Sequence, residues 1–102
     1  MNLDLELIAK KIISIQSNPE FISISLDELT LSPATRSKQS LCVYISTLDV
    51  QSSFIVWDSG EIETIIHSEN HPEVIETVQV GSNDATLQEF FKFIKTLLSQ
   101  SS

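Results

Sequence analysis

The chain has few of the residues on which disulfide scaffolds, zinc sites and phosphate-binding loops depend. Its 102 residues include one cysteine, two glycines, one tryptophan and one tyrosine. The single cysteine, Cys42, excludes an internal disulfide and a cysteine-based zinc site. Two glycines cannot form a phosphate cradle, and no GxSxG, HExxH or P-loop pattern is present. We therefore expect no enzymatic activity and no cofactor.

Basic residues are also scarce. Six lysines and arginines stand against fourteen aspartates and glutamates, which gives a net charge of −8. Such a surface repels phosphate, so binding to nucleic acid or to an anionic membrane is disfavoured. It attracts basic protein partners and raises their association rates at low salt. The alternative is that the acids serve only to keep the protein soluble.

Long hydrophobic runs are absent as well. No apolar run approaches the ~20 residues that cross a bilayer. The first residues, MNLDLELIAKKII, contain early acids and no small-residue cleavage site, unlike a secretory signal. We expect a soluble cytoplasmic protein. Its length predicts a single domain over residues 1–102 with one modest core.

An amphipathic helix is predicted near each end of the chain. In residues 3–16, apolar side chains recur at helical spacing, with Asn2 or Asp4 as the cap and Pro19 as a stop signal. Thr86 and Glu89 fit a capping box at the start of the second helix. The apolar stripe that we expect this helix to bury consists of Leu87, Phe90, Phe91, Ile94, Leu97 and Leu98.

Between these helices, polar and apolar residues alternate as they do in half-buried strands. We expect strands at residues 21–26, 41–47, 52–57 and 61–67, and a further strand, at the edge of the sheet, at 74–80. Leu29 and Leu31 extend the first strand irregularly. Polar loops are predicted at 32–40 and 68–72 and a turn at 48–51. Asp58-Ser59-Gly60 should close a hairpin, with Gly60 at positive φ.

This order of elements predicts an α+β fold. An antiparallel meander of four or five strands would pack one face against the N-terminal helix and the C-terminal amphipathic helix.

Two histidines, His67 and His71, are interleaved with glutamates. On one helix such a pair could hold a metal ion. Here the stretch spans a strand end and the Pro72 loop, so its geometry is not fixed. We predict that it binds no transition metal.

Three acids near the hairpin, Asp58, Glu61 and Glu63, suggest paired carboxylates for acid–base chemistry. Exposed acids at turns are far commoner than catalytic pairs, so we assign them no catalytic role.

The informative aromatic residues are Tyr44 and Trp57, which can share a face on neighbouring strands. They either pack in the core against a helix or anchor a binding surface, where Trp and Tyr are typical hot spots. Cys42 has no local nucleophile signature, and we expect it to be buried as a small hydrophobic residue.

The order of the segments and one motif resemble a known family. Ser32-Pro33-Ala34 precedes the strand LCVYIST, and Val56-Trp57-Asp58-Ser59-Gly60-Glu61 follows. In these features the chain resembles the TriTu family of predicted immunity proteins from bacterial polymorphic toxin systems. The family pattern has a strand ending in Val-Trp-Glu/Asp-Ser-Gly, followed by an acid. The resemblance covers most of the chain in order and implies a non-catalytic protein that binds and neutralises a cognate toxin.

Two non-enzymatic functions are therefore considered. The first is a protein-binding module of the immunity type, whose partner is a basic toxin domain contacted through Trp57, Asp58, Glu61 and Glu63. The second is a small structural or assembly protein that self-associates, for example as a homodimer, through an exposed strand such as 74–80 or through a sheet face.

Overall fold

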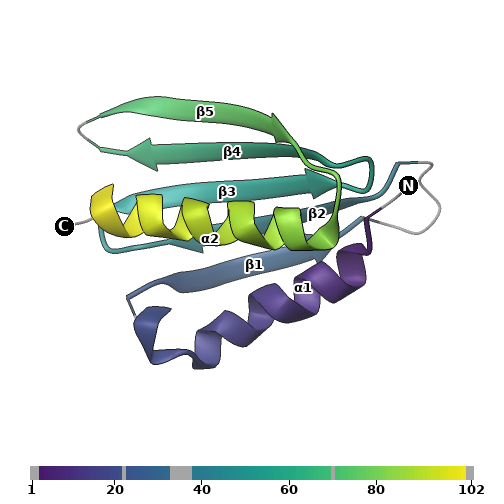
Figure 1. Cartoon of the computed structure of the whole chain (residues 1–102). Coiled ribbons are helices and arrows are strands. Elements are labelled where there is room, and N and C mark those ends of the chain that lie inside the picture. The colour runs from purple at the N-terminus through teal and green to yellow at the C-terminus, as the bar shows by residue number, and fades with distance from the viewer. Residues whose placement is uncertain (1–2, 22, 33–37, 70, 101–102) are drawn as a thin grey trace.

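The computed structural model describes residues 3–21, 23–32, 38–69 and 71–100. A helix lies at each end of the chain, with five strands between them (Figure 1). The elements in chain order are α1 (Leu5–Ile13), two short 3₁₀ helices (Ser14–Ser17 and Pro19–Phe21), β1 (Ser25–Leu31), β2 (Ser40–Ser46), β3 (Val50–Trp57), β4 (Glu61–Ser68), β5 (His71–Gln79) and α2 (Asn83–Gln100). The predicted α+β class is confirmed.

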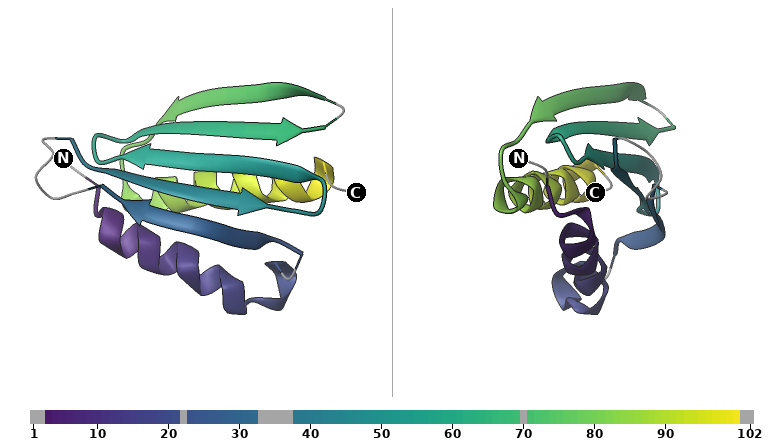
Figure 2. Two further views of the ribbon diagram at one scale, coloured as in Figure 1. Left: turned by 180° about the vertical axis from the view of Figure 1, so that it is seen from behind. Right: turned by 90° about the vertical axis from the view of Figure 1, so that its right-hand side faces the viewer.

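The five strands form one sheet in the order β1-β2-β3-β4-β5, and each strand is antiparallel to the next. Both helices lie on the same side of this sheet, as the end view in Figure 2 shows. Helix α1 runs beside β1, and α2 crosses the middle of the sheet (Figure 1). In the described part of the chain, no helix lies on the opposite face of the sheet.

The hydrophobic core lies between the sheet and the two helices. Alternate residues of β2 face the helices, so Leu41, Val43 and Ile45 are buried as predicted. In the centre, the ring of Phe54 meets the ring of Phe90 edge-on, with 5.1 Å between the centroids. The other buried apolar residues are Leu5, Ile8, Ala9, Ile12, Ile15, Val50, Val56, Ile62, Ile66, Leu87, Phe93, Ile94 and Leu97.

The first helix is shorter than the predicted span of 3–16. Asp4 caps it as expected, because its carboxylate accepts a hydrogen bond of 3.1 Å from the backbone N–H of Leu7. The α-helix ends at Ile13 and the chain tightens into a 3₁₀ helix up to Ser17. The other predicted cap, Asn2, lies outside the described residues.

The first strand is misplaced in the prediction, which put it at 21–26. The side chain of Asn18 accepts a hydrogen bond from Glu20, and its carbonyl accepts one from Phe21. These bonds hold the chain in turns, and it becomes extended only at Ser25. Strand β1 therefore runs further along the chain than predicted and contains Leu29 and Leu31. Its pairing with β2 has a register shift between Leu26 and Glu28. The alternation of serine and apolar residues in FISISL predicted a strand here and gave no indication of these turns. Ile22 itself lies outside the described residues.

The other strand boundaries differ from the prediction by a few residues at most. Strand β3 begins at Val50, because Thr47 donates a backbone hydrogen bond to Val50 and closes the turn early. The predicted strand at 74–80 is β5. It begins already at His71 and forms an edge of the sheet. Of the predicted loop at 32–40, residues 33–37 are not described and Ser40 belongs to β2.

The predicted capping box of the second helix is wrong. The helix begins at Asn83, and the hydroxyl of Ser82 accepts a hydrogen bond of 3.0 Å from the N–H of Ala85. Thr86 is buried inside the helix and donates its hydroxyl proton to the carbonyl of Ser82. Ser82 therefore caps the helix, and Glu89 lies beyond its first turn.

The predicted core position of Phe91 is also wrong. Its side chain is 38% exposed and stacks on Phe21, with 6.2 Å between the ring centroids. Phe93, which the predicted stripe omitted, is buried against Phe54 instead. A helix places neighbouring residues about 100° apart, so Phe91 and Phe93 fall on different sides of the buried Phe90. The position of the sheet decides which side is covered.

No helix in the described part of the chain is both long and apolar enough to span a membrane.

Candidate functional site

Neither described helix covers the other face of the sheet, and we call this face the open face. In register across the strands, Tyr44 lies opposite Glu28 and Ser53, while Glu63 lies opposite Ile55 and Thr77. The open face carries the side chains of Glu28, Cys42, Tyr44, Ser53, Ile55, Trp57, Glu61, Glu63, Ile65, Ile75, Thr77 and Gln79.

Tyr44 and Trp57 belong to this face and not to the core. Tyr44 is 45% exposed, and Trp57 is partly exposed. Of the two interpretations of these aromatics, packing against a helix is therefore wrong. Cys42 lies beside Tyr44 and is only partly buried, so the expectation of a buried cysteine is also wrong. A hydrogen bond with the Cys42 side chain raises the pKa of the Tyr44 hydroxyl.

The hairpin between β3 and β4 fixes the position of Trp57. The carbonyl of Trp57 accepts a hydrogen bond of 2.9 Å from the N–H of Gly60, which has φ +97° as predicted. The end of β5 holds this turn from the side. Val80 donates its backbone N–H to Gly60 at 2.8 Å, and the Gln79 side chain donates to the Ser59 carbonyl at 2.8 Å.

Asp58 has a structural position at the base of the hairpin. It is only 9% exposed, and its carboxylate accepts a hydrogen bond of 3.2 Å from the backbone N–H of Gln39. Its own backbone bonds to Gln39 and to Leu3. Asp58 thus joins the N-terminus, the chain before β2 and the hairpin, and it does not line the hollow described next.

Trp57, Glu61 and Glu63, the other three predicted contact residues, line one hollow of about 470 Å³. Thr77 and Gln79 of β5 complete its open-face rim. The sequence did not predict these two residues as part of the site. They lie beside Glu63 and Glu61 only because of the register in which β5 pairs with β4, and the sequence does not show that register. The only signal for them was the alternation of VIETVQV, which predicts a strand but not which strand it pairs with.

A cation of the protein itself contacts two of the residues that line this hollow. The Lys38 ammonium lies 2.8 Å from Oε1 of Glu61 and 5.6 Å from the centre of the Trp57 ring. The ion pair, mainly through its hydrogen bond, holds the pKa of Glu61 below its usual value. Both side chains are about half exposed, so a surface pair of this kind is weak and exchangeable. An aromatic face beside carboxylates is suited to lysine and arginine side chains.

The two histidines are not brought together as metal ligands. Nδ1 of His67 lies 3.8 Å from a carboxylate oxygen of Glu73, while His71 pairs with Ser68 at the start of β5. Within the described ranges, no group of three or more His, Cys, Asp and Glu side chains is arranged to hold a metal ion.

We predict that protein purified without a tag contains no stoichiometric transition metal. Elemental analysis by mass spectrometry should give the same background for the wild type and for His67→Ala. A bound ion in the wild type that His67→Ala loses would contradict this prediction and would reopen the question of enzymatic activity.

Comparison of the chain with models of protein families, with curated proteins and with solved structures finds no match.

Proposed function

We propose that this protein is a non-enzymatic, cytoplasmic binding module of the immunity type, which binds a basic toxin domain through its open face and neutralises it. The observation that carries the proposal is the hollow formed by Trp57, Glu61 and Glu63, together with the Lys38 ammonium that contacts Glu61 and the Trp57 ring. A lysine or arginine of a partner would find the same aromatic ring and the same carboxylates.

The distribution of charge supports the open face as the contact surface. Lys10 and Lys11 lie on α1, and Lys92 and Lys95 lie on α2, so four of the six basic residues belong to the helical side. β4 and β5 contain no lysine or arginine. The net charge of −8 steers a basic partner toward the protein, and on the open face Glu61 and Glu63 are the acids that line the hollow beside Trp57.

The resemblance of the hairpin motif to the TriTu immunity family supports the same role for the hairpin. Trp57 and Glu61 belong to the hollow, while Asp58 and Gly60 fix the turn that holds them. Partly exposed Trp and Tyr on a rigid sheet are typical anchors of protein interfaces. A binding role requires no catalytic group.

The partner can be identified from the gene neighbourhood and by capture. A large toxin gene directly upstream of this gene supports the proposal, and its product should be the protein that the immobilised chain enriches. The captured domain should be basic and should bind with one-to-one stoichiometry. Enrichment of no toxin domain, together with no toxin gene nearby, would contradict the proposed function.

We predict that Glu61→Lys combined with Glu63→Lys slows association with this toxin domain at least tenfold at low salt. Reversing two charges in the hollow repels a basic partner before contact. The melting temperature should change little, because both side chains are on the surface. Stopped-flow measurements at low and high salt give the rates, and the difference should shrink at high salt.

The matched control is Glu20→Lys combined with Asp49→Lys. It changes the net charge by the same amount, and both residues are exposed and far from the hairpin. This control should bind nearly as fast as the wild type. Equal association rates for the two double variants would show that net charge, and not the hollow, governs binding.

A further inference from the structure

β5 is a long edge strand with free backbone groups. It spans His71–Gln79, and among the described strands it has a neighbour only on the β4 side. Val80 donates its N–H to Gly60, on the side of β4. Because backbone groups alternate along an antiparallel strand, the N–H and C=O groups of Ile75, Thr77 and Gln79 point away from the sheet.

The two edges of the sheet are protected differently. On β1, the register shifts between Leu26 and Glu28, and α1 lies alongside (Figure 1). On β5, Pro72 and the register shift opposite Ser68 affect only the first residues. From Val74 to Gln79 the pairing with β4 is regular, without proline or lysine, and Ile75 is 57% exposed. Bulges, prolines and lysines are common means of blocking strand addition, and this stretch has none of these three; its one charged residue is Glu76, which would favour a basic strand.

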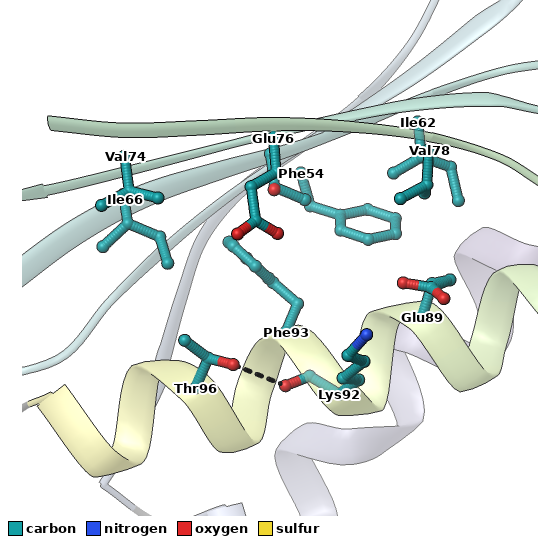
Figure 3. A pocket seen from close by; sticks show the side chains of 11 residues that line it. Phe54, Ile62, Ile66, Val74, Glu76, Val78, Glu89, Lys92, Phe93 and Thr96 are labelled. Carbon is teal, nitrogen blue, oxygen red and sulfur yellow. Dashed lines mark hydrogen bonds between the residues drawn. The ribbon is translucent and has the colours of Figure 1, made fainter.

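A groove of about 270 Å³ lies on the helix side of β5, because α2 does not cover β4 and β5 completely (Figure 3). Its floor is apolar and includes Phe54 and Phe93. Glu76 of β5 points toward α2, and Glu89 of α2 lines the facing wall beside Lys92 (Figure 3). Carboxylates therefore border β5 on both faces of the sheet, with Glu76 and Glu89 on one face and Glu63 on the other.

We propose that the basic partner adds an extended strand to β5. Outward N–H and C=O groups of Ile75, Thr77 and Gln79 would pair with the backbone of that strand. Its alternate side chains would lie on the two faces of the sheet. On the helix side, apolar side chains or lysine and arginine stems contact Val74 and Val78, and the cationic ends reach Glu76 and Glu89. On the open face, basic side chains reach Glu63.

A basic strand fits this edge better than a second copy of the chain. Two copies would each bring a net charge of −8 to the contact. Strand β5 itself carries Glu73 and Glu76 and no lysine or arginine, so pairing of two β5 strands gathers four carboxylates and no compensating lysine or arginine. A strand rich in lysine or arginine removes this repulsion. The inference rests on the proposed function, since it gives the mode in which the same partner binds.

The first experiment needs no partner protein. The probe is the capped peptide Arg-Val-Arg-Thr-Arg-Val-Arg, titrated into ¹⁵N-labelled protein and followed by NMR, with a peptide that has glutamate in place of arginine as control. The arginine peptide should shift the β5 amides and slow hydrogen exchange at Ile75 and Thr77. Glu76→Gln combined with Glu89→Gln should weaken its binding several-fold. Unchanged exchange at Ile75 and Thr77 overturns the inference.

The variant Thr77→Pro tests the backbone contact directly. It removes an N–H that points away from β4, a position at which an edge strand tolerates proline. We expect at least a tenfold loss of peptide affinity. Thr77→Val keeps the N–H and changes only the side chain at the rim of the hollow, so it should retain most of the peptide affinity that Thr77→Pro loses. Urea unfolding of both variants shows whether the fold is retained. Ile75→Lys places a charge on the same edge and provides a second way to block strand addition. Its control is Leu48→Lys, which introduces the same charge at a turn residue that is 95% exposed.

The toxin domain separates this inference from the proposed function. If the domain binds Thr77→Pro as tightly as the wild type while the Glu61→Lys, Glu63→Lys variant loses binding, strand addition is wrong and the function stands. If the peptide binds β5 but no toxin domain binds the protein, the function is wrong. If concentrated protein alone sediments as a dimer that Thr77→Pro abolishes, the edge takes a second copy, and the inference is overturned.

Discussion

Phe90→Ala should lower the free energy of unfolding by about 3–5 kcal/mol, as expected for a large aromatic removed from a packed core. Phe90 is fully buried, and its ring meets Phe54 edge-on at 86°. Alanine would leave a cavity between α2 and the centre of the sheet. Because small domains unfold with about 5–15 kcal/mol, the variant should lose a large part of its stability in urea unfolding.

The next residue supplies the control for this prediction. Phe91 is the same residue type in the same helix, but it is partly exposed and its ring contacts Phe21 and Phe90. Phe91→Ala should cost about 1–2 kcal/mol, from lost partial burial and two aromatic pairs. Equal losses at the two positions, or a larger loss at Phe91, would contradict the described orientation of α2 on the sheet.

Gly60→Val should destabilise the protein by about 2–4 kcal/mol. A β-branched residue is strained at φ +97°, and a Cβ atom at this position would collide with the backbone carbonyl of Val80. The clash must separate the hairpin from the end of β5 and disturb the hydrogen bond from Val80 to Gly60. Thermal and urea unfolding measure the loss.

Gly81→Val is the matched control, because it introduces the same side chain into open space. Apart from Gly81 and its two chain neighbours, no heavy atom of the described residues lies within 4 Å of the Cβ position at Gly81. We expect a change of less than about 1 kcal/mol. A Gly60→Val variant as stable as Gly81→Val would show that the hairpin does not need a glycine, and the account of how Trp57 is positioned would fail.

Strong local signals explain the parts of the fold that the sequence predicted well. The alternation of Leu41, Val43 and Ile45 has period two over a whole strand, and Gly60 follows two turn-forming residues. Such signals need no knowledge of distant segments. The hairpin and the central strands therefore agree with the prediction within a few residues.

Competing hydrogen bonds explain most of the errors in local structure. The Asn18 side chain holds a turn where alternation alone favoured a strand, and Ser82 caps α2 before the capping box at Thr86 is reached. Both residues have short polar side chains that bind nearby backbone groups. The chain has many such short polar residues, and the alternation of polar and apolar residues does not show which of them form these hydrogen bonds with the backbone.

The candidate site depends on tertiary placement, which periodicity does not contain. Whether Trp57 faces the helices or the open side depends on which side of the sheet α2 covers. Thr77 and Gln79 join the hollow only through the register of β5 on β4. Asp58 looks like an exposed turn acid in the sequence, and only contact with Gln39, distant in the chain, gives it a structural position.

Growth of cells that express the toxin domain is the most direct test of the proposed neutralisation. The domain encoded beside this gene should stop growth when expressed alone, and co-expression of the wild-type protein should restore it. The Glu61→Lys, Glu63→Lys variant, expressed at the same level, should restore growth poorly, whereas Glu20→Lys with Asp49→Lys should restore it fully. Failure of the wild type to restore growth, or full restoration by the open-face variant, would contradict the account.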